Sequence, residues 1–273
     1  MWGVAYTIAK PATESFPPIL LVAICYALAA LVLFRPWPRM QTPFWALLAA
    51  GTLGGSVQSA LIFIGVTLVP ATTATLIVQT QVPFAVIAAW AMGQERMNRS
   101  RLLGITVALL GAAVVVGLPD AVDQTAGLLM IVLGTFSWGI AQGIIGTASH
   151  DSGARLMGAL CAVAAPQALL MSVLLETGQR EALANADYVD WATLLFVAIC
   201  GFIVPYAIWY GLLRRYPVDR IAPFALLMPI VGVATAFVVL EERPSFLVFV
   251  GGAIILTGLA MVVRSPTIPI RSA

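Results

Sequence analysis

Thr75 to Gly111 reads TLIVQTQVPFAVIAAWAMGQERMNRSRLLGITVALLG, an apolar run that contains two amides and a proline, then a short charged turn, then a second apolar run with spaced glycines. The same plan returns from Ala222 to Gly258, APFALLMPIVGVATAFVVLEERPSFLVFVGGAIILTG. Two apolar runs joined by a short polar turn are typical of a helical hairpin, so this sequence uses one hairpin twice.

The spacing of marker residues supports this interpretation. Pro83 lies twelve residues before Glu95, and Pro229 lies twelve residues before Glu241. Glycines then follow nine and sixteen residues after Glu95 and after Glu242, at Gly104, Gly111, Gly251 and Gly258. Agreement in order and in spacing predicts two related structural units.

The amino-acid composition indicates what surrounds the folded protein. Hydrophobic residues make up 61% of the chain and charged residues 10%, whereas soluble domains have about 25% charged residues. A chain of this length cannot bury so much apolar surface in water, so we expect a lipid bilayer around most of it. The net charge of +2 is too small to suggest a nucleic-acid partner.

The sequence lacks the residues that a metal site, a haem site or an enzyme embedded in the membrane would need. Cys25, Cys161 and Cys200 lie inside apolar runs, as small packing residues do, and His150 is the only histidine. We therefore expect no metal site and no cofactor. An enzyme in the membrane would need clustered acids, histidines or an activated nucleophile, so we expect no enzyme.

The sequence contains ten apolar segments, most of them as long as a membrane-spanning helix. They lie at 1–14, 17–34, 43–66, 70–92, 101–118, 125–148, 154–175, 189–212, 218–240 and 245–263. Single strands cannot satisfy their backbone in lipid, so the prediction is an all-α polytopic bundle of ten transmembrane helices. The first segment is about half a spanning length, so we expect that the given chain begins inside its first helix; the alternative is a first helix that is short.

The basic residues predict the orientation. Eleven of them lie on one side when the connections are assigned to alternate sides: Arg35, Arg39, Arg96, Arg99, Arg101, Arg155, Arg214, Arg215, Arg220, Arg264 and Arg271. The opposite side holds Lys10, Arg180 and Arg243. The positive-inside rule then predicts a cell inner-membrane protein with both termini in the cytoplasm.

A second pair of motifs divides the chain into halves. Trp2-Gly3 and Trp138-Gly139 are 136 residues apart, while the hairpins repeat at about 146. We expect a first five-helix repeat at 1–118, a second at 125–264 and a cytoplasmic tail at 265–273. Because five is odd, the second unit enters the membrane from the opposite side. Inverted repeats in transporters enclose a substrate site at mid-membrane.

The hairpins VPFAVIAAWAMGQERMNRSRLLG and MPIVGVATAFVVLEERPSFLVFVGG, with the two Trp-Gly pairs, resemble the EamA family of the drug/metabolite transporter superfamily. The run from Pro205 to Leu213, the later Arg220-Ile-Ala-Pro223 and Gln79-Thr-Gln81 look most like its O-acetylserine/cysteine exporter branch. The resemblance implies ten helices, an inverted repeat and export of small metabolites or amino acids.

Uncharged polar and aromatic residues supply the candidate substrate site. Amides and hydroxyls both donate and accept hydrogen bonds, and aromatic faces attract an ammonium group, so together they can hold a zwitterion. The candidates are Trp2, Tyr6, Gln58, Thr75, Gln79, Trp138, Gln142, Tyr206 and Trp209. Each could instead bond or pack between helices, or anchor the interface. Gln79 and Gln81 are two residues apart, so we expect only one of them in a cavity.

Three further features have alternative roles. Gly139 and Gly143 form a GxxxG pattern, which fits a homodimer or internal packing. Lys10 could meet a substrate carboxylate or extend from a helix end to water. Glu95, Glu241 and Glu242 are expected to cap or tether their hairpins.

The preferred hypothesis is a transporter that exports amino acids or their derivatives by alternating access through a neutral polar cavity. Export of other small organic compounds or drugs is the first alternative. A membrane channel or a non-transporting scaffold is the alternative from a different class.

Overall fold

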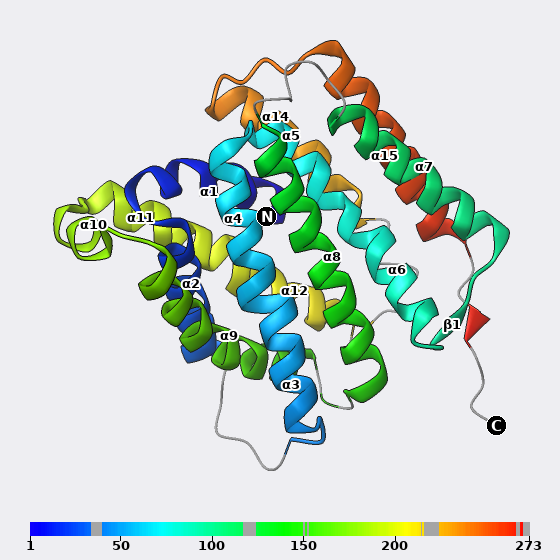
Figure 1. The fold of residues 1–273 in the computed structure, drawn as a ribbon, viewed down its shortest axis with the longest axis horizontal. Coiled ribbons are helices and arrows are strands. Elements are labelled where there is room, and N and C mark those ends of the chain that lie inside the picture. Colours follow the sequence, from blue (N-terminus) through cyan, green and yellow to red (C-terminus); the bar gives the residue numbers. More distant parts are fainter. Residues whose placement is uncertain are drawn as a thin grey trace.

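The computed structural model describes residues 1–33, 40–116, 124–149, 151, 153–213, 215, 224–265 and 268–269, without the side chains of Tyr6, Tyr210, Leu213, Ile268 and Pro269. This part of the chain is a bundle of α-helices (Figure 1). The first half contains α1 (Trp2–Ser15), α2 (Pro18–Leu33), α3 (Phe44–Gly51), α4 (Gln58–Leu68), α5 (Ala71–Ile77), α6 (Gln81–Ala91) and α7 (Arg99–Val116). The second half contains α8 (Thr125–Ala148), α9 (Gly153–Leu175), α10 (Gln179–Asn185), α11 (Tyr188–Val197), α12 (Val204–Leu213), α14 (Leu227–Val239) and α15 (Phe246–Arg264).

Three long helical runs contain a turn of different geometry. A π-helical segment, η1 (Thr52–Val57), joins α3 to α4, and another, η4 (Ala198–Ile203), joins α11 to α12. A 3-10 turn, η2 (Val78–Thr80), joins α5 to α6. Such interruptions frequently mark functional positions in a helix.

The helices fall where the apolar segments predict them, and the prediction of a polytopic helical membrane protein is confirmed. Among the described residues, seven helical runs are long and apolar enough to cross a membrane, and α2 and α14 are shorter apolar helices. Large apolar side chains cover the outside of the bundle, for example Leu31, Leu174 and Val238. Surfaces of this kind need lipid around them. The ninth predicted segment, 218–240, is described as a helix from Leu227; residues 216–223 lie outside the described part.

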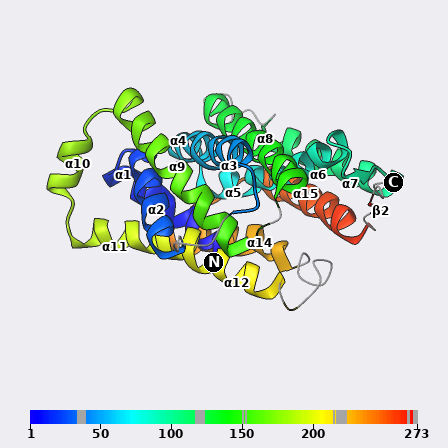
Figure 2. The same cartoon turned by 90° about the horizontal axis from the view of Figure 1, so that it is seen from below.

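The spaced glycines of the repeated hairpins meet each other. Helices α7 and α15 run side by side (Figures 1 and 2). A Cβ atom on Gly104 would lie 2.8 Å from the carbonyl oxygen of Gly258, and one on Gly111 would lie 2.6 Å from the backbone nitrogen of Ile255. Residues seven apart share one helix face, so these glycines line a crossing that admits no side chain.

The glycines of the two Trp-Gly pairs also make close crossings. Gly3 of α1 contacts the backbone of Met228 in α14. Gly139 of α8 lies against α6, where an added Cβ would be 2.8 Å from the backbone carbon of Phe84. Gly143, one turn after Gly139 in α8, faces Met92, the residue that follows α6. The GxxxG pattern therefore serves packing inside the chain.

One small feature departs from the all-α prediction. Residues Glu95–Arg96 form a two-residue strand, β1, that pairs antiparallel with β2 (Ile268–Pro269). The pairing brings the C-terminal segment beside the turn between α6 and α7. Arg101 at the start of α7 forms a buried ion pair with Glu95, so this acid ties its own hairpin as predicted.

Candidate functional site

A cavity of about 400 Å³ lies between the two halves of the chain. The cavity is lined by residues from α1, α2, α4, α6, α8, α11, α12, α14 and α15, and from segments between helices. Its polar and aromatic lining consists of Trp2, Tyr26, Gln58, Ser59, Phe63, Gln79, Gln81, Trp138, Gln142, Phe202, Tyr206 and Trp209. Within the described part of the chain, no acidic or basic side chain lines this cavity.

Most of the predicted candidates come together here. Trp2, Gln58, Gln79, Trp138, Gln142, Tyr206 and Trp209 line the cavity although they come from α1, α4, η2, α8 and α12. Thr75 does not line it, because its methyl group packs against Gly232 of α14. The side chain of Tyr6 lies outside the described part of the structure.

The prediction that only one of Gln79 and Gln81 lines a cavity is wrong, because both residues line it. The reason is the 3-10 turn over Val78–Thr80 that lies between the regular helices. Residues two apart point about 160° from each other around an α-helix, but only about 120° around a 3-10 helix. The tighter turn therefore brings both amides toward the same space.

Sequence reasoning missed the contribution of α2. Tyr26 of α2 lines the cavity, and its hydroxyl lies 2.7 Å from the hydroxyl of Ser59. The hydroxyl of Ser59 in turn donates to Oε1 of Gln58, at 3.0 Å. The ring of Phe202 meets Tyr26 edge-on, with 5.0 Å between the ring centroids. A tyrosine within an apolar helix was the available signal, but an interfacial tyrosine gives the same pattern.

The π-helical segments accept hydrogen bonds from the helices that carry the Trp-Gly pairs. The indole nitrogen of Trp2 donates to the carbonyl oxygen of Gly201 in η4, at 3.0 Å. The hydroxyl of Ser137, next to Trp138, donates to the carbonyl oxygen of Leu53 in η1, at 2.7 Å. A π turn frees carbonyl groups from the regular ladder, and these donors satisfy two of them.

Aromatic rings form one wall of the cavity. Trp2 meets Tyr206 edge-on, with 5.3 Å between ring centroids, and lies 6.0 Å from Trp209. Gln58 and Gln79 lie on other helices, α4 and η2, and are buried apart from their contact with the cavity. The site thus combines aromatic faces with amide groups, and its geometry suits a small solute that carries polar groups but no net charge.

Comparison with known sequences assigns the family. The EamA-like transporter family matches residues 1–117 and again residues 125–264. The chain belongs to the EamA-like transporter family. The residues that carried the resemblance in the sequence lie in both matched stretches, and the membrane transporter expected from them is confirmed.

Several relatives of this EamA protein have been named. A protein of Escherichia coli (strain K12) named "Probable amino-acid metabolite efflux pump" is 29% identical over 273 residues, covering 95% of this chain and 90% of that protein. A "Probable terminal-alkyne amino-acid exporter" of Streptantibioticus cattleyicolor is 28% identical over 246 residues, covering 89% of this chain and 80% of that one. A crystal structure with 18% identity superposes with a TM-score of 0.56 over 95% of this chain and 93% of its own, which shows a shared fold.

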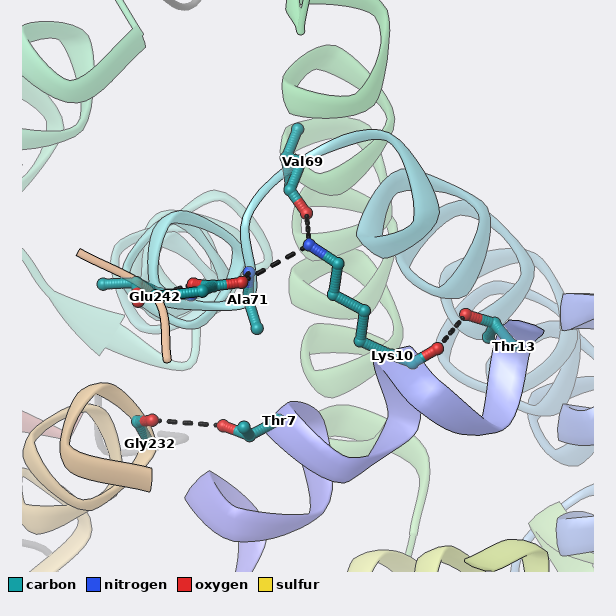
Figure 3. Close-up of polar contacts among 8 residues, drawn as sticks. Thr7, Lys10, Thr13, Val69, Ala71, Gly232 and Glu242 are labelled. Atoms are coloured by element: carbon teal, nitrogen blue, oxygen red, sulfur yellow. Dashed lines mark hydrogen bonds and ion pairs between the residues drawn. The ribbon is translucent and has the colours of Figure 1, made fainter. Parts of the chain in front are cut away.

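A charged cluster ties the helices of the EamA protein together at one end, which we call the Glu242 end. There α1 and α4 finish and α5 begins, close to the residues that follow α14 (Figure 3). The ammonium group of Lys10 donates to the carbonyl oxygen of Val69, at 3.0 Å, and to the carboxylate of Glu242, at 3.4 Å. Lys10 therefore pairs within the protein and lies outside the cavity lining.

Glu242 also caps the first turn of α5. Its carboxylate accepts hydrogen bonds from the backbone N–H groups of Ala71, at 2.7 Å, and Thr72, at 2.9 Å, and from the Thr72 hydroxyl, at 2.8 Å. A carboxylate suits this position because the first N–H groups of a helix lack partners and carry partial positive charge. We expected Glu242 to serve its own hairpin, whereas its partners lie about 170 residues away in sequence.

The environment lowers the pKa of Glu242. Burial acts to raise the pKa, but the hydrogen bonds from Thr72 and Ala71 and the charge of Lys10 outweigh it, so the pKa lies below its ordinary value. A second carboxylate caps a helix start at this end. Glu176, which follows α9, accepts hydrogen bonds from the backbone N–H groups of Ile19, at 2.7 Å, and Leu20, at 3.0 Å, in the first turn of α2.

The cavity reaches toward the opposite end of the bundle. Its lining includes Ala225, just before α14, and Val263, next to the last residue of α15. Trp209 lies in the final turns of α12. Two polar residues of the lining, Gln58 and Gln79, lie near the middle of their helical runs. Charged contacts therefore join the helices at the Glu242 end, and the uncharged cavity extends toward the opposite end of the bundle.

Proposed function

We propose that this EamA protein is an inner-membrane exporter of amino acids or closely related small metabolites, and that it works by alternating access. The observation that carries the proposal is an uncharged amide and aromatic cavity between two halves of a family transporter, with the helices tied at one end. The names of the two relatives, an amino-acid metabolite efflux pump and an amino-acid exporter, support the substrate class and the direction.

The proposed architecture is ten transmembrane helices in two inverted five-helix repeats, 1–118 and 125–264, with a cytoplasmic tail at 265–273. Equivalent contacts in the two halves support it. Gly3 meets α14 beside Pro229, and Gly139 meets α6 beside Pro83. Helices α7 and α15, the last of each unit, pack on each other, as do α2 and α9, the second of each unit.

The proposed orientation puts both termini in the cytoplasm and the Glu242 end outside. In that orientation we expect the contacts among Lys10, Glu242 and the first turn of α5 to close the cavity toward the exterior. Fusion tags at residues 1 and 273 test the orientation, because both must report from the cytoplasmic face. A pair of tags that report from opposite faces contradicts the ten-helix topology.

Flux into proteoliposomes tests transport. The purified full chain is expected to give saturable uptake of labelled L-alanine, L-leucine or L-phenylalanine that preloaded unlabelled amino acid accelerates. A linear leak without saturation would support the channel alternative, and no flux of any amino acid would support a scaffold. Saturable flux of organic cations or drugs in place of amino acids would favour the drug-export alternative.

The cavity residues are proposed to bind substrate, and two substitutions test them. Gln79→Ala and Trp138→Ala each remove a polar or aromatic contact from the lining, and we expect flux at a fixed low substrate concentration to fall about tenfold or more. Membrane insertion should be unchanged, because neither side chain faces lipid. Wild-type flux in both variants would remove them from the site.

A further inference from the structure

The amide of Gln58 is held in one orientation by a chain of hydrogen bonds. An amide oxygen can only accept, so the Ser59 hydroxyl uses its single proton toward Oε1 of Gln58. The contact between Ser59 and Tyr26 must then have the Tyr26 hydroxyl as its donor. Protons therefore run from Tyr26 to Ser59 to Gln58, and the Nε2 group of Gln58 has no protein acceptor in the described chain.

Gln79 is held in the opposite sense. Its Nε2 group donates to the backbone carbonyl of Thr75, at 3.3 Å, one helical turn earlier. The Oε1 atom of Gln79 has no donor among the described residues. Both side chains are more than nine-tenths buried, with 7% of Gln58 and 2% of Gln79 exposed, and both line the cavity. One buried amide thus offers N–H groups to a ligand, and the other offers an oxygen.

The other lining residues limit which ligands can bind to Gln58 and Gln79. No charged side chain lines the cavity in the described part of the chain, so a ligand with net charge would leave that charge without a counter-ion. A free carboxylate is a strong acceptor for the N–H group of Gln58. A free ammonium is a strong donor for the oxygen of Gln79, and the aromatic wall attracts it as well.

We propose that Gln58 and Gln79 are an oriented donor and acceptor pair that selects net-neutral α-amino acids, with Gln58 binding the carboxylate and Gln79 the ammonium group. This inference rests on the proposed transport of amino acids and adds which end of the substrate each amide recognises. Ser59 and Tyr26 are positioning residues that keep the N–H groups of Gln58 directed at the ligand.

The test uses substrate derivatives that lose one end at a time. Counterflow of labelled L-leucine into proteoliposomes is measured against unlabelled L-leucine, its methyl ester, which lacks the carboxylate, and N-acetyl-L-leucine, which lacks the ammonium group. Wild type should prefer L-leucine over each derivative by about tenfold or more, because each derivative loses a hydrogen bond to a charged group and also carries a net charge. These ratios do not depend on the fraction of active protein.

The substitutions should separate the two preferences. Gln58→Leu is expected to reduce the preference over the methyl ester at least about threefold relative to wild type, with the net charge of the ester setting the preference that remains. It should leave the preference over N-acetyl-L-leucine near the wild-type ratio. Gln79→Leu should do the reverse. Gln142→Leu is the matched control, because it removes a lining amide whose orientation no hydrogen bond from a described residue fixes, and it should weaken all three ligands alike.

Ser59→Ala provides a second variant that leaves both glutamines in place. It frees the Gln58 amide to rotate, so the preference over the methyl ester should fall, and Ser59→Thr should restore it. Unchanged ratios in the Gln58 and Gln79 variants, or equal loss of both preferences in each, would overturn the proposed pair while amino-acid transport stands. Wild type that exchanges no amino acid would overturn the proposed function itself.

Discussion

The two repeated hairpins, α5 to α7 and α14 to α15, share their proline, acid and glycine spacing but differ in what their acids bind. Glu95 pairs with Arg101 inside its own hairpin. Glu242 reaches the start of α5 and Lys10, both in the other half of the chain. The glycines, by contrast, behave alike, because those of α7 and α15 meet at one crossing. Residues at equivalent positions of the two hairpins therefore make the same close packing contacts, whereas the partners of the acids depend on which residues lie near each turn.

The glycine crossing should show the largest effect, and the two halves should respond equally. Gly111→Leu and Gly258→Leu each force a side chain into a backbone contact, and we expect either to lower stability by about 3 kcal/mol or more. Thermal unfolding in detergent measures this loss. Leu110→Ala, on the exposed face of α7, is the control and should change little. A large difference between the two glycine variants would contradict an equivalent role.

Removal of the Glu242 carboxylate should come next. Glu242→Ala leaves the first turn of α5 without its cap and Lys10 without its anion, so we expect a loss of roughly 2 kcal/mol. Glu242→Gln keeps one acceptor oxygen and should lose about half as much. Melting temperatures give the order. If Glu242→Ala matches wild type, the carboxylate does not tie α5 to the second half.

The pH dependence of this contact has a definite sign. The folded pKa of Glu242 lies below its ordinary value of 4.5, so its contribution is fully present above that value and is lost as pH falls through the folded pKa. The difference in melting temperature between wild type and Glu242→Gln should stay constant from pH 7 to about 5 and shrink below pH 4.5. A difference that grows on acidification would contradict this assignment.

Lys10 should contribute least. Its ion pair with Glu242 spans 3.4 Å, and the Lys10 side chain is 28% exposed, so Lys10→Met should cost less than about 1 kcal/mol. Comparison with Glu242→Ala in the same unfolding assay separates the ion pair from the helix cap. A loss as large as that of Glu242→Ala would mean that the charge of Lys10, and not the cap, stabilises this end.

The sequence predicted the helices and most of the cavity for a common physical reason. Lipid excludes polar side chains, so Gln58, Gln79, Gln142 and their aromatic neighbours had to face the interior or each other. The tight 3-10 turn that brings Gln81 to the cavity leaves no comparable sign in composition or periodicity. Tyr26 was missed because the interface and the interior both accept a tyrosine.

The sequence also did not predict which distant backbone groups the acids of the connections bind. Asp151 accepts hydrogen bonds from the N–H groups of Gln41 and Thr42, about 110 residues away. Burial acts to raise its pKa, but the bonds from Thr42 and Gln41 and the charge of Arg155 hold that pKa below its ordinary value. Acids in short connections usually cap the next helix. Only the packed structure reveals that Glu242 and Glu176 cap distant helices and that Asp151 binds the connection before α3.

The uncharged cavity has a consequence for the energetics of the cell. Moving one elementary charge through a membrane potential of 100 mV costs or yields about 2.3 kcal/mol. A zwitterion that crosses by itself, through a cavity whose described lining has no ionised side chain, moves no net charge in either direction. Its export would therefore be electrically silent, so that the interior-negative voltage of a bacterium neither drives the solute out nor holds it back.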